Sequence, residues 1–123
     1  DTLGLTVTAD GKTAHIILAC AAMTPALADR LRGADLVFFD GTLWRDDEMI
    51  TQGLAPKTGA RMGHMAMSGE AGSIAALAPL GIARKVFVHI NNSNPVWDAT
   101  APERAELAAA GWDIPHAGQE YDL

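Results

Sequence analysis

The sequence DLVFFDGT, residues Asp35–Thr42, decides the fold of this chain. Its four consecutive apolar residues predict a strand buried inside a sheet over Asp35–Asp40. A second apolar run, ARKVFVHI, predicts another buried strand over residues 83–90. Asp40 closes the first strand and His89 closes the second. Because functional side chains of α/β proteins gather where strands run out into loops, a site is expected there.

Turn and capping residues place the elements around these strands. ADGK separates two alternating runs and predicts a β-hairpin over Leu3–Ala19. Thr24 and Pro25 are typical of a helix N-cap and first residue, and they predict a short helix that stops at a glycine. Ser68 is expected to cap a helix over residues 69–80. The hairpin therefore comes first, and helices separate the later strands.

The last third of the chain continues this alternation. Thr100 and Glu103 have the spacing of a capping box, which predicts a helix over residues 102–110 that ends at a glycine. A turn or two of helix is expected over 45–51, a glycine-rich loop over 52–64, and one or two short edge strands in the tail. Strands that alternate with helices after a leading hairpin predict an α/β layered domain formed by the whole chain.

Composition and charge exclude several classes of protein. The 123 residues are 49% hydrophobic and 20% charged, which suits one globular domain that buries a core. A net charge of −6 with nine scattered Lys and Arg argues against a nucleic-acid surface. One cysteine excludes an internal disulfide, and no apolar run approaches the ~18 residues of a membrane helix. We therefore expect a cytoplasmic protein that binds neither nucleic acid nor a membrane.

Four side chains that can bind a metal or move protons lie at the ends of predicted strands or in the loop between two of them: Cys20, Asp40, His64 and His89. Two imidazoles, a thiol and a carboxylate are ligands for zinc or another transition metal, and strand ends can bring them together. None of the four forms a local signature of the HExxH kind. A metal-centred site is the resulting hypothesis.

Three of these residues have an ordinary structural alternative. Cys20 can be an inert buried thiol, and Asp40 can organise the turn before Gly41. His89 can be a hydrogen-bonded histidine of the core. His64 has few local partners in its glycine-rich loop, so a structural role explains it less well.

The residues near the two histidines are of types that line ligand-binding pockets. Methionines surround His64 and are typical of a flexible apolar lining rather than of metal ligands. NNSNP after His89 predicts a turn, and its amides can also hold a polar ligand. We expect three of these side chains to contact a small molecule: Met65, Asn91 and Asn92.

Three stretches of the chain resemble a known family: FFDGTLWRDDEMI (38–50), MGHMAMSGEAGSIAAL (62–77) and VFVHINNSNP (86–95). They are similar to the C-terminal part of PqqB, a family of pyrroloquinoline quinone (PQQ) biosynthesis proteins in the metallo-β-lactamase superfamily. Ala19 and Ala66 stand where we expect glycine and proline in that family. The resemblance implies that the 123 residues form the C-terminal half of an αββα sandwich, within a single domain.

The resemblance also implies roles for the site residues. His89 is similar to the last metal-ligand histidine of the metallo-β-lactamase fold. Cys20 stands where the superfamily places a bridging aspartate and sometimes a cysteine, which favours one metal ion over two. Asp40 and His64 resemble a carboxylate and histidine that act together near the metals of ribonuclease Z.

For function, the resemblance implies an oxidative step of PQQ synthesis. Non-haem iron and O2 would hydroxylate the tyrosine ring of a cross-linked Glu-Tyr intermediate. His89 would hold the iron together with ligands outside this chain, and zinc is a second possible metal. His64 and Asp40 would form a hydrogen-bonded catalytic pair that orients the substrate or moves protons.

Two other functions stay open. One is a carrier or binding protein for PQQ, without oxygen chemistry. The other is a metal-dependent hydrolase, which would need two metals and a basic surface that this acidic chain lacks. Because the chain starts at Asp1 without a methionine, we expect a fragment that is inactive alone. An N-terminal segment, or a second copy in a homodimer, would then stabilise it.

Overall fold

A computed structural model of the chain describes residues 3–123. It contains one sheet with the strand order β1-β2-β3-β4-β5. Strand β1 pairs antiparallel with β2 as the expected hairpin, and all later pairs are parallel. The strands are β1 (Gly4–Ala9), β2 (Lys12–Ile17), β3 (Leu36–Asp40), β4 (Arg84–Val88) and β5 (Trp112–Asp113). The predicted α/β class and the two buried central strands are therefore confirmed.

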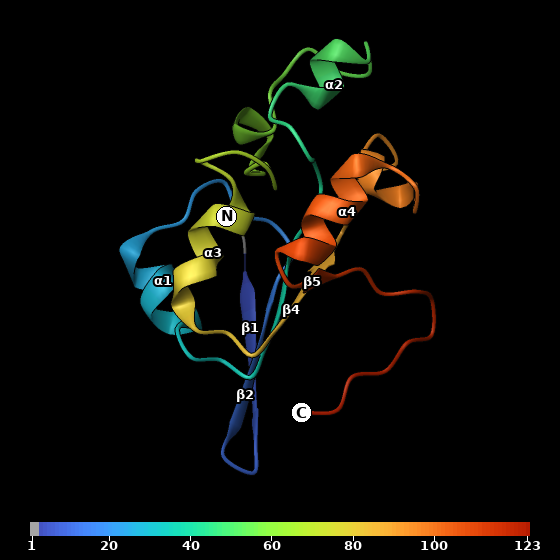
Figure 1. The fold of residues 1–123 in the computed structure, drawn as a ribbon. Coiled ribbons are helices and arrows are strands. Elements are labelled where there is room, and N and C mark those ends of the chain that lie inside the picture. Colours follow the sequence, from blue (N-terminus) through green and yellow to red (C-terminus); the bar gives the residue numbers. More distant parts are fainter. Residues whose placement is uncertain (1–2) are drawn as a thin grey trace.

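Short helices connect the parallel strands. The α-helices are α1 (Pro25–Leu31), α2 (Glu48–Thr51), α3 (Ser73–Leu77) and α4 (Pro102–Ala109). Three 3-10 turns occupy Ala60–Met62, Ala78–Leu80 and Pro95–Trp97. Figure 1 shows α1 and α3 on one flank of the sheet, α4 beside β4 and β5, and α2 beyond the end of the strands. In residues 3–123, no helix is long and apolar enough to cross a membrane.

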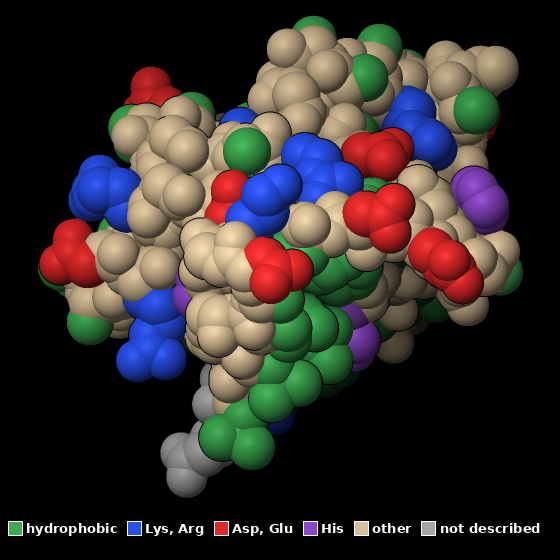
Figure 2. Space-filling model, turned by 90° about the horizontal axis from the view of Figure 1, so that it is seen from below, with side chains coloured by type: hydrophobic (Ala, Val, Ile, Leu, Met, Phe, Trp, Pro, Cys, Tyr) green, Lys and Arg blue, Asp and Glu red, His purple; other side chains and the backbone are tan. Residues whose placement is uncertain are grey.

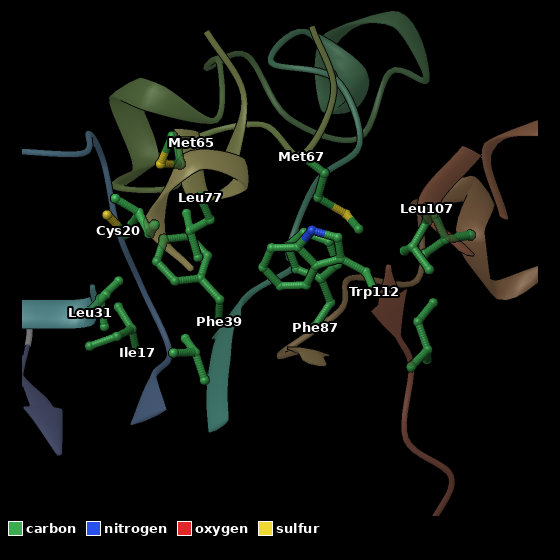
Figure 3. Close-up of a cluster of buried hydrophobic side chains, with 14 of the residues drawn as sticks. Ile17, Cys20, Leu31, Phe39, Met65, Met67, Leu77, Phe87, Leu107 and Trp112 are labelled. Carbon is green, nitrogen blue, oxygen red and sulfur yellow. The ribbon is translucent and has the colours of Figure 1, made fainter. Parts of the chain in front are cut away.

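The core lies between the helices and one face of the sheet. Val37, Phe39 and Phe87 point to this face and are 0% exposed. Phe87 stacks on Trp112 with ring centroids 3.7 Å apart. Figure 3 shows these rings among side chains from α1, α3 and α4, with two methionines of the loop before α3 above them. Because this face is buried, the positions of β3 and β4 are fixed, and so are the positions of the residues that follow the two strands.

The opposite face of the sheet is only partly covered. Leu5 and Val7 of β1 pair with Ile16 and Ala14, yet they are 60% and 48% exposed. A small second cluster is completed by the C-terminal tail, where Tyr121 packs edge-on against a phenylalanine of β3. Figure 2 shows a patch of apolar side chains on the surface of the molecule. One layer of helices on one sheet face is half of a sandwich, as predicted.

One predicted helix start is wrong, and at a second helix the start is right but the predicted cap is wrong. Ser68 does not cap a helix, because its hydroxyl donates to the Trp44 carbonyl at 2.6 Å and α3 starts five residues later, after Gly72. Thr100 does not form a capping box, because its hydroxyl and amide both donate to the Asp98 carboxylate. The Asp98 carboxylate thus binds the Thr100 hydroxyl that was expected to cap α4. The N-cap of α4 is Ala101 instead.

Candidate metal centre

The site begins where β3 and β4 end side by side. Asp40 pairs with Val88 in the parallel register, so the residues that follow both strands emerge at one edge of the sheet. The Gly41 amide donates to the Val88 carbonyl at 2.8 Å, and the Asn91 amide donates to the Thr42 carbonyl at 3.1 Å. These bonds extend the pairing beyond the strands. They hold residues 40–42 against residues 88–91.

Backbone constraints at this edge fix the loop geometry. A Cβ on Gly41 would lie 2.9 Å from the Phe87 Cβ and 3.1 Å from the Val88 carbonyl oxygen, so only glycine fits. His89 adopts φ of +57°, in the left-handed region that non-glycine residues rarely occupy. Strained residues of this kind persist where the surrounding structure holds them, and they cluster at functional sites.

His64 reaches the same edge from the glycine-rich loop. Its amide donates to the Gly59 carbonyl at 2.8 Å, and the next residue, Met65, donates to the Cys20 carbonyl. Met65 and Met67 are buried in the core at 6% and 0% exposure. The methionines therefore anchor the loop on either side of the alanine at position 66, as the expected apolar lining.

Asp40 accepts four hydrogen bonds while it is fully buried. Its Oδ1 accepts from the Thr42 amide at 3.0 Å and from the Thr42 hydroxyl at 2.6 Å. Its Oδ2 accepts from the Cys20 amide at 3.0 Å and from His64 Nδ1 at 2.8 Å. These donors compensate the cost of burying a carboxylate and fix its orientation.

The two imidazoles meet at the hydroxyl of Thr42. Thr42 Oγ1 lies 3.1 Å from His64 Nδ1 and 2.9 Å from His89 Nδ1. The two rings stack with centroids 5.6 Å apart and an interplanar angle of 22°. Side chains from the ends of two strands and from one loop thus form a single cluster.

This cluster has the composition of a transition-metal site. One ligand atom from each of Asp40, His64 and His89 lies within 4.8 Å of the other two. Two imidazole nitrogens and a carboxylate oxygen suit iron or zinc. Asp40 is buried, His64 is half-buried and His89 is exposed, so the cluster is open to solvent on the His89 side. The residues present therefore fit a metal ion with positions left for other ligands.

Cys20 is beside the cluster but presents its backbone to it. Its amide binds Asp40, whereas its thiol donates to the Ala22 carbonyl at 3.3 Å. Burial raises the pKa of the thiol, with the Asp40 charge adding to the effect, so the thiolate that a metal needs is disfavoured. The prediction of Cys20 as a metal ligand does not agree with this geometry. The alternative, that Cys20 is a buried and inert thiol, agrees better with these contacts.

The three expected substrate-binding residues lie in different surroundings, and only the backbone of Asn91 is recorded in contact with the cluster in residues 3–123, through the Thr42 carbonyl. Met65 lines a hollow of about 780 Å³ together with residues 21–23, 45–47 and 68–71. The Asn91 side-chain amide donates to the Ser93 hydroxyl at 2.7 Å, and Asn92 is exposed. Contact of these three residues with a substrate stays a prediction.

Thr42 is the member of the cluster that the sequence did not single out. Its only signal was its position two residues after a strand-ending aspartate, in the pattern DGT. That pattern also describes an ordinary turn, in which a hydroxyl or carboxylate binds the backbone two residues away. Its contacts with both histidines depend on residues 22 and 47 positions further along the chain.

Comparison with known proteins agrees with this fold. The family model described as "Beta-lactamase superfamily domain" matches residues 1–90, which include the whole cluster. The chain belongs to the β-lactamase superfamily. A diphosphatase of the PhnP family shares the fold of this superfamily member, with a TM-score of 0.52 at 17% identity over 96% of this chain and 41% of that chain.

Closer relatives confirm the resemblance drawn from the sequence. The chain is 55% identical over 123 residues to Coenzyme PQQ synthesis protein B of Xanthomonas oryzae pv. oryzae (strain MAFF 311018). It is 58% identical over 125 residues to the protein of the same name from Rhodopseudomonas palustris (strain BisB5). All of this superfamily chain is covered in both matches, but only 41% of each relative.

A solved structure gives the same match in three dimensions. The Zn²⁺-bound PqqB from Methylobacterium extorquens aligns with a TM-score of 0.96 and 50% identity. The alignment covers 99% of this chain and 44% of that chain. The chain therefore spans about two fifths of the length of the relatives that it matches.

Proposed function

We propose that this chain supplies part of the metal centre of an enzyme of PQQ synthesis. The observation that carries the proposal is the convergence of Asp40, His64 and His89 from three separate segments. The relatives named as PQQ synthesis proteins support the pathway, and the zinc bound by the solved relative supports a metal. The imidazole and carboxylate groups support the same class of metal.

The reaction that we propose is hydroxylation of the tyrosine ring of a cross-linked Glu-Tyr precursor. Non-haem iron, when bound, would supply the reaction with O2. The open, solvent-facing side of the cluster at His89 leaves space for a substrate. His89 is the residue of this chain that we assign as a metal ligand, and further ligands would come from outside the chain. Zinc is the alternative metal.

In this proposal, Asp40 and His64 handle protons rather than bind the metal. The Asp40 carboxylate accepts from His64 Nδ1 at 2.8 Å, which leaves Nε2 of the neutral ring as a base. In this hydroxylation the ring carbon gives up a proton and the new ring oxygen takes one up, so His64 Nε2 can relay the proton between them. The buried carboxylate stabilises the imidazolium that forms.

Metal stoichiometry tests the assignment of His89. The complete polypeptide that carries this chain is loaded anaerobically with Fe²⁺, desalted, and analysed for bound iron by inductively coupled plasma spectrometry. We expect His89→Ala to weaken iron binding by at least about 100-fold, because it removes a ligand rather than an outer partner. His116→Ala is the matched control, since His116 is an exposed histidine of the tail. Full iron occupancy in His89→Ala would overturn the assignment.

Oxygen consumption separates the enzyme from a carrier of PQQ. The iron-loaded complete polypeptide is mixed with a Glu-Tyr cross-linked dipeptide in air, with ascorbate as the two-electron reductant, and O2 uptake and product mass are followed. The proposal predicts O2 uptake with a mass gain of one oxygen atom, while the second oxygen atom leaves as water. Tight binding of PQQ without O2 uptake would support the carrier instead, and hydrolysis of the dipeptide would support a hydrolase.

A further inference from the structure

We propose that Thr42 is a positioning residue that fixes the tautomer of His89, while Asp40 fixes that of His64. The Thr42 hydroxyl holds His89 with the proton on Nδ1, so that the ring keeps an unprotonated Nε2 for a metal. The proposal rests on the proposed function for its purpose. The assignment of the tautomers, however, depends only on the hydrogen bonds of the cluster.

The hydroxyl of Thr42 has one proton, and the cluster determines where it goes. Oγ1 lies 2.6 Å from Asp40 Oδ1, the shortest of its contacts in the cluster. An ionised carboxylate can only accept hydrogen bonds, and such charge-assisted bonds are the short, strong ones. Thr42 therefore donates its proton to Asp40 rather than to the His89 carbonyl oxygen, which lies 3.1 Å away, and has none left for either imidazole.

The remaining capacity of Thr42 is to accept. Its oxygen lies 2.9 Å from His89 Nδ1 and 3.1 Å from His64 Nδ1. Because the Thr42 proton is already donated, the contact with His89 Nδ1 is a hydrogen bond only if Nδ1 carries the hydrogen. His64 Nδ1 also carries its hydrogen, and that hydrogen goes first to the ionised Asp40 Oδ2 at 2.8 Å.

Asp40 is left without capacity for a metal. Each of its two oxygens accepts two hydrogen bonds, from amides, a hydroxyl and an imidazole. A carboxylate has about four lone-pair positions, so all of them are used. The unprotonated nitrogens are then the two Nε2 atoms, that of His89 for a metal and that of His64 as the proton acceptor, and Asp40 acts through Thr42 and His64.

Thr42 is itself held in place. Its amide donates to Asp40 and its carbonyl accepts from the Asn91 amide, so both backbone groups are fixed at the sheet edge. Its branched Cβ further restricts χ1. The hydroxyl is therefore a rigid point between the two rings.

The two histidines differ in a way that makes the proposal testable. His64 Nδ1 has both Thr42 and Asp40 as partners, whereas the Thr42 hydroxyl is the side-chain partner of His89 Nδ1 in residues 3–123. Removal of the hydroxyl should therefore release the tautomer of His89 and leave that of His64. A general disturbance of the fold would affect both rings.

The experiment measures imidazole ¹⁵N chemical shifts in the metal-free complete polypeptide labelled on histidine. The spectra are recorded at mildly alkaline pH. We expect protonated Nδ1 and unprotonated Nε2 signals for His64 and His89. Thr42→Val should shift His89 toward the Nε2–H tautomer, and Thr42→Ser should restore the original signals. Thermal melts of all variants check the fold.

Metal affinity provides the second readout. Competition titration with a chelator should give a 10- to 100-fold weaker metal complex for Thr42→Val and a near-normal one for Thr42→Ser. A wild-type His89 with its proton on Nε2, or an unchanged His89 tautomer in Thr42→Val, would overturn the proposal. Failure to bind iron or zinc with the expected tautomers intact would contradict the proposed function only.

Discussion

Asp40 shows at the level of one residue how the cluster is stabilised. Asp40→Asn keeps the shape but replaces one acceptor oxygen by an NH2 group, which would face backbone or imidazole N–H donors. Leaving buried donors unpaired costs about 2–4 kcal/mol, so we expect the free energy of unfolding to fall by that amount. Urea unfolding measures it.

The control for this substitution is an aspartate on the surface. The Asp29 side chain is 77% exposed, so Asp29→Asn should change the free energy of unfolding by less than about 0.5 kcal/mol. Equal effects of the two substitutions would show that the hydrogen bonds of Asp40 do not stabilise the fold.

Cys20 provides a pH test. Because burial raises the pKa of its thiol, less thiolate is present near neutral pH than in an ordinary cysteine. The rate of alkylation by iodoacetamide should therefore reach half of its maximum above the ordinary pKa of 9.0. An exposed thiol made by Ala21→Cys in a Cys20→Ser background is the comparison. A midpoint for Cys20 below that of the exposed thiol would contradict the burial argument.

Residue patterns predicted part of this site. Asp40, His64 and His89 meet because parallel strands end at one edge, and that much follows from placing strands and loops. The thiol of Cys20 was misplaced because the direction of a side chain after a strand is not encoded in spacing. The role of Thr42 could be inferred only from interatomic distances, since it depends on which group accepts its single hydroxyl proton.

Gly72 decides where α3 begins at the scale of elements. A Cβ there would lie 2.2 Å from the Ser68 carbonyl oxygen and 2.6 Å from that of Met67, both backbone atoms that cannot move away cheaply. Gly72→Ala should therefore lower the free energy of unfolding by about 2 kcal/mol or more. Gly4→Ala is the matched control, because its Cβ would meet only the end of the flexible Ile17 side chain.

Thermal or urea unfolding of both alanine variants measures this difference. Gly4→Ala should cost less than about 1 kcal/mol. A Gly72→Ala variant as stable as the original chain would mean that the close approach to Ser68 is not a constraint.

Helices and strands were predictable where the sequence pattern fitted only one kind of secondary structure. The hairpin, β3, β4, the helix after Thr24 and the helix over residues 102–109 follow from periodicity, turn residues and helix-start signals. The start of α3 was misassigned because Ser68 binds Trp44 of the preceding loop, a partner 24 residues away. Tertiary contacts of this kind override a local capping signal.

The uncovered sheet face governs the behaviour of the whole molecule. Strand β1 is at one edge of the sheet, where its Leu5 and Val7 are 60% and 48% exposed, and Leu3, just before the strand, is 86% exposed. An exposed apolar edge strand favours association with another copy. We therefore expect the 123-residue chain to self-associate, so that its weight-average sedimentation coefficient rises with concentration.

Surface variants identify the face responsible. Leu5→Lys combined with Val7→Lys should abolish the concentration dependence, since charges on an edge strand oppose pairing. Leu54→Lys is the control, because Leu54 is 58% exposed but lies in the loop after α2. A chain that stays monomeric at every concentration, or one that Leu54→Lys dissociates equally well, would contradict this prediction.

The most direct test of the account is where a metal binds in the complete polypeptide that carries this chain. A crystal loaded anaerobically with Fe²⁺ is measured at wavelengths on both sides of the iron absorption edge. The account predicts an anomalous peak about 2.0–2.3 Å from Nε2 of His89, with Nδ1 of that ring on Thr42. A fully occupied iron site that does not touch His89 would contradict it.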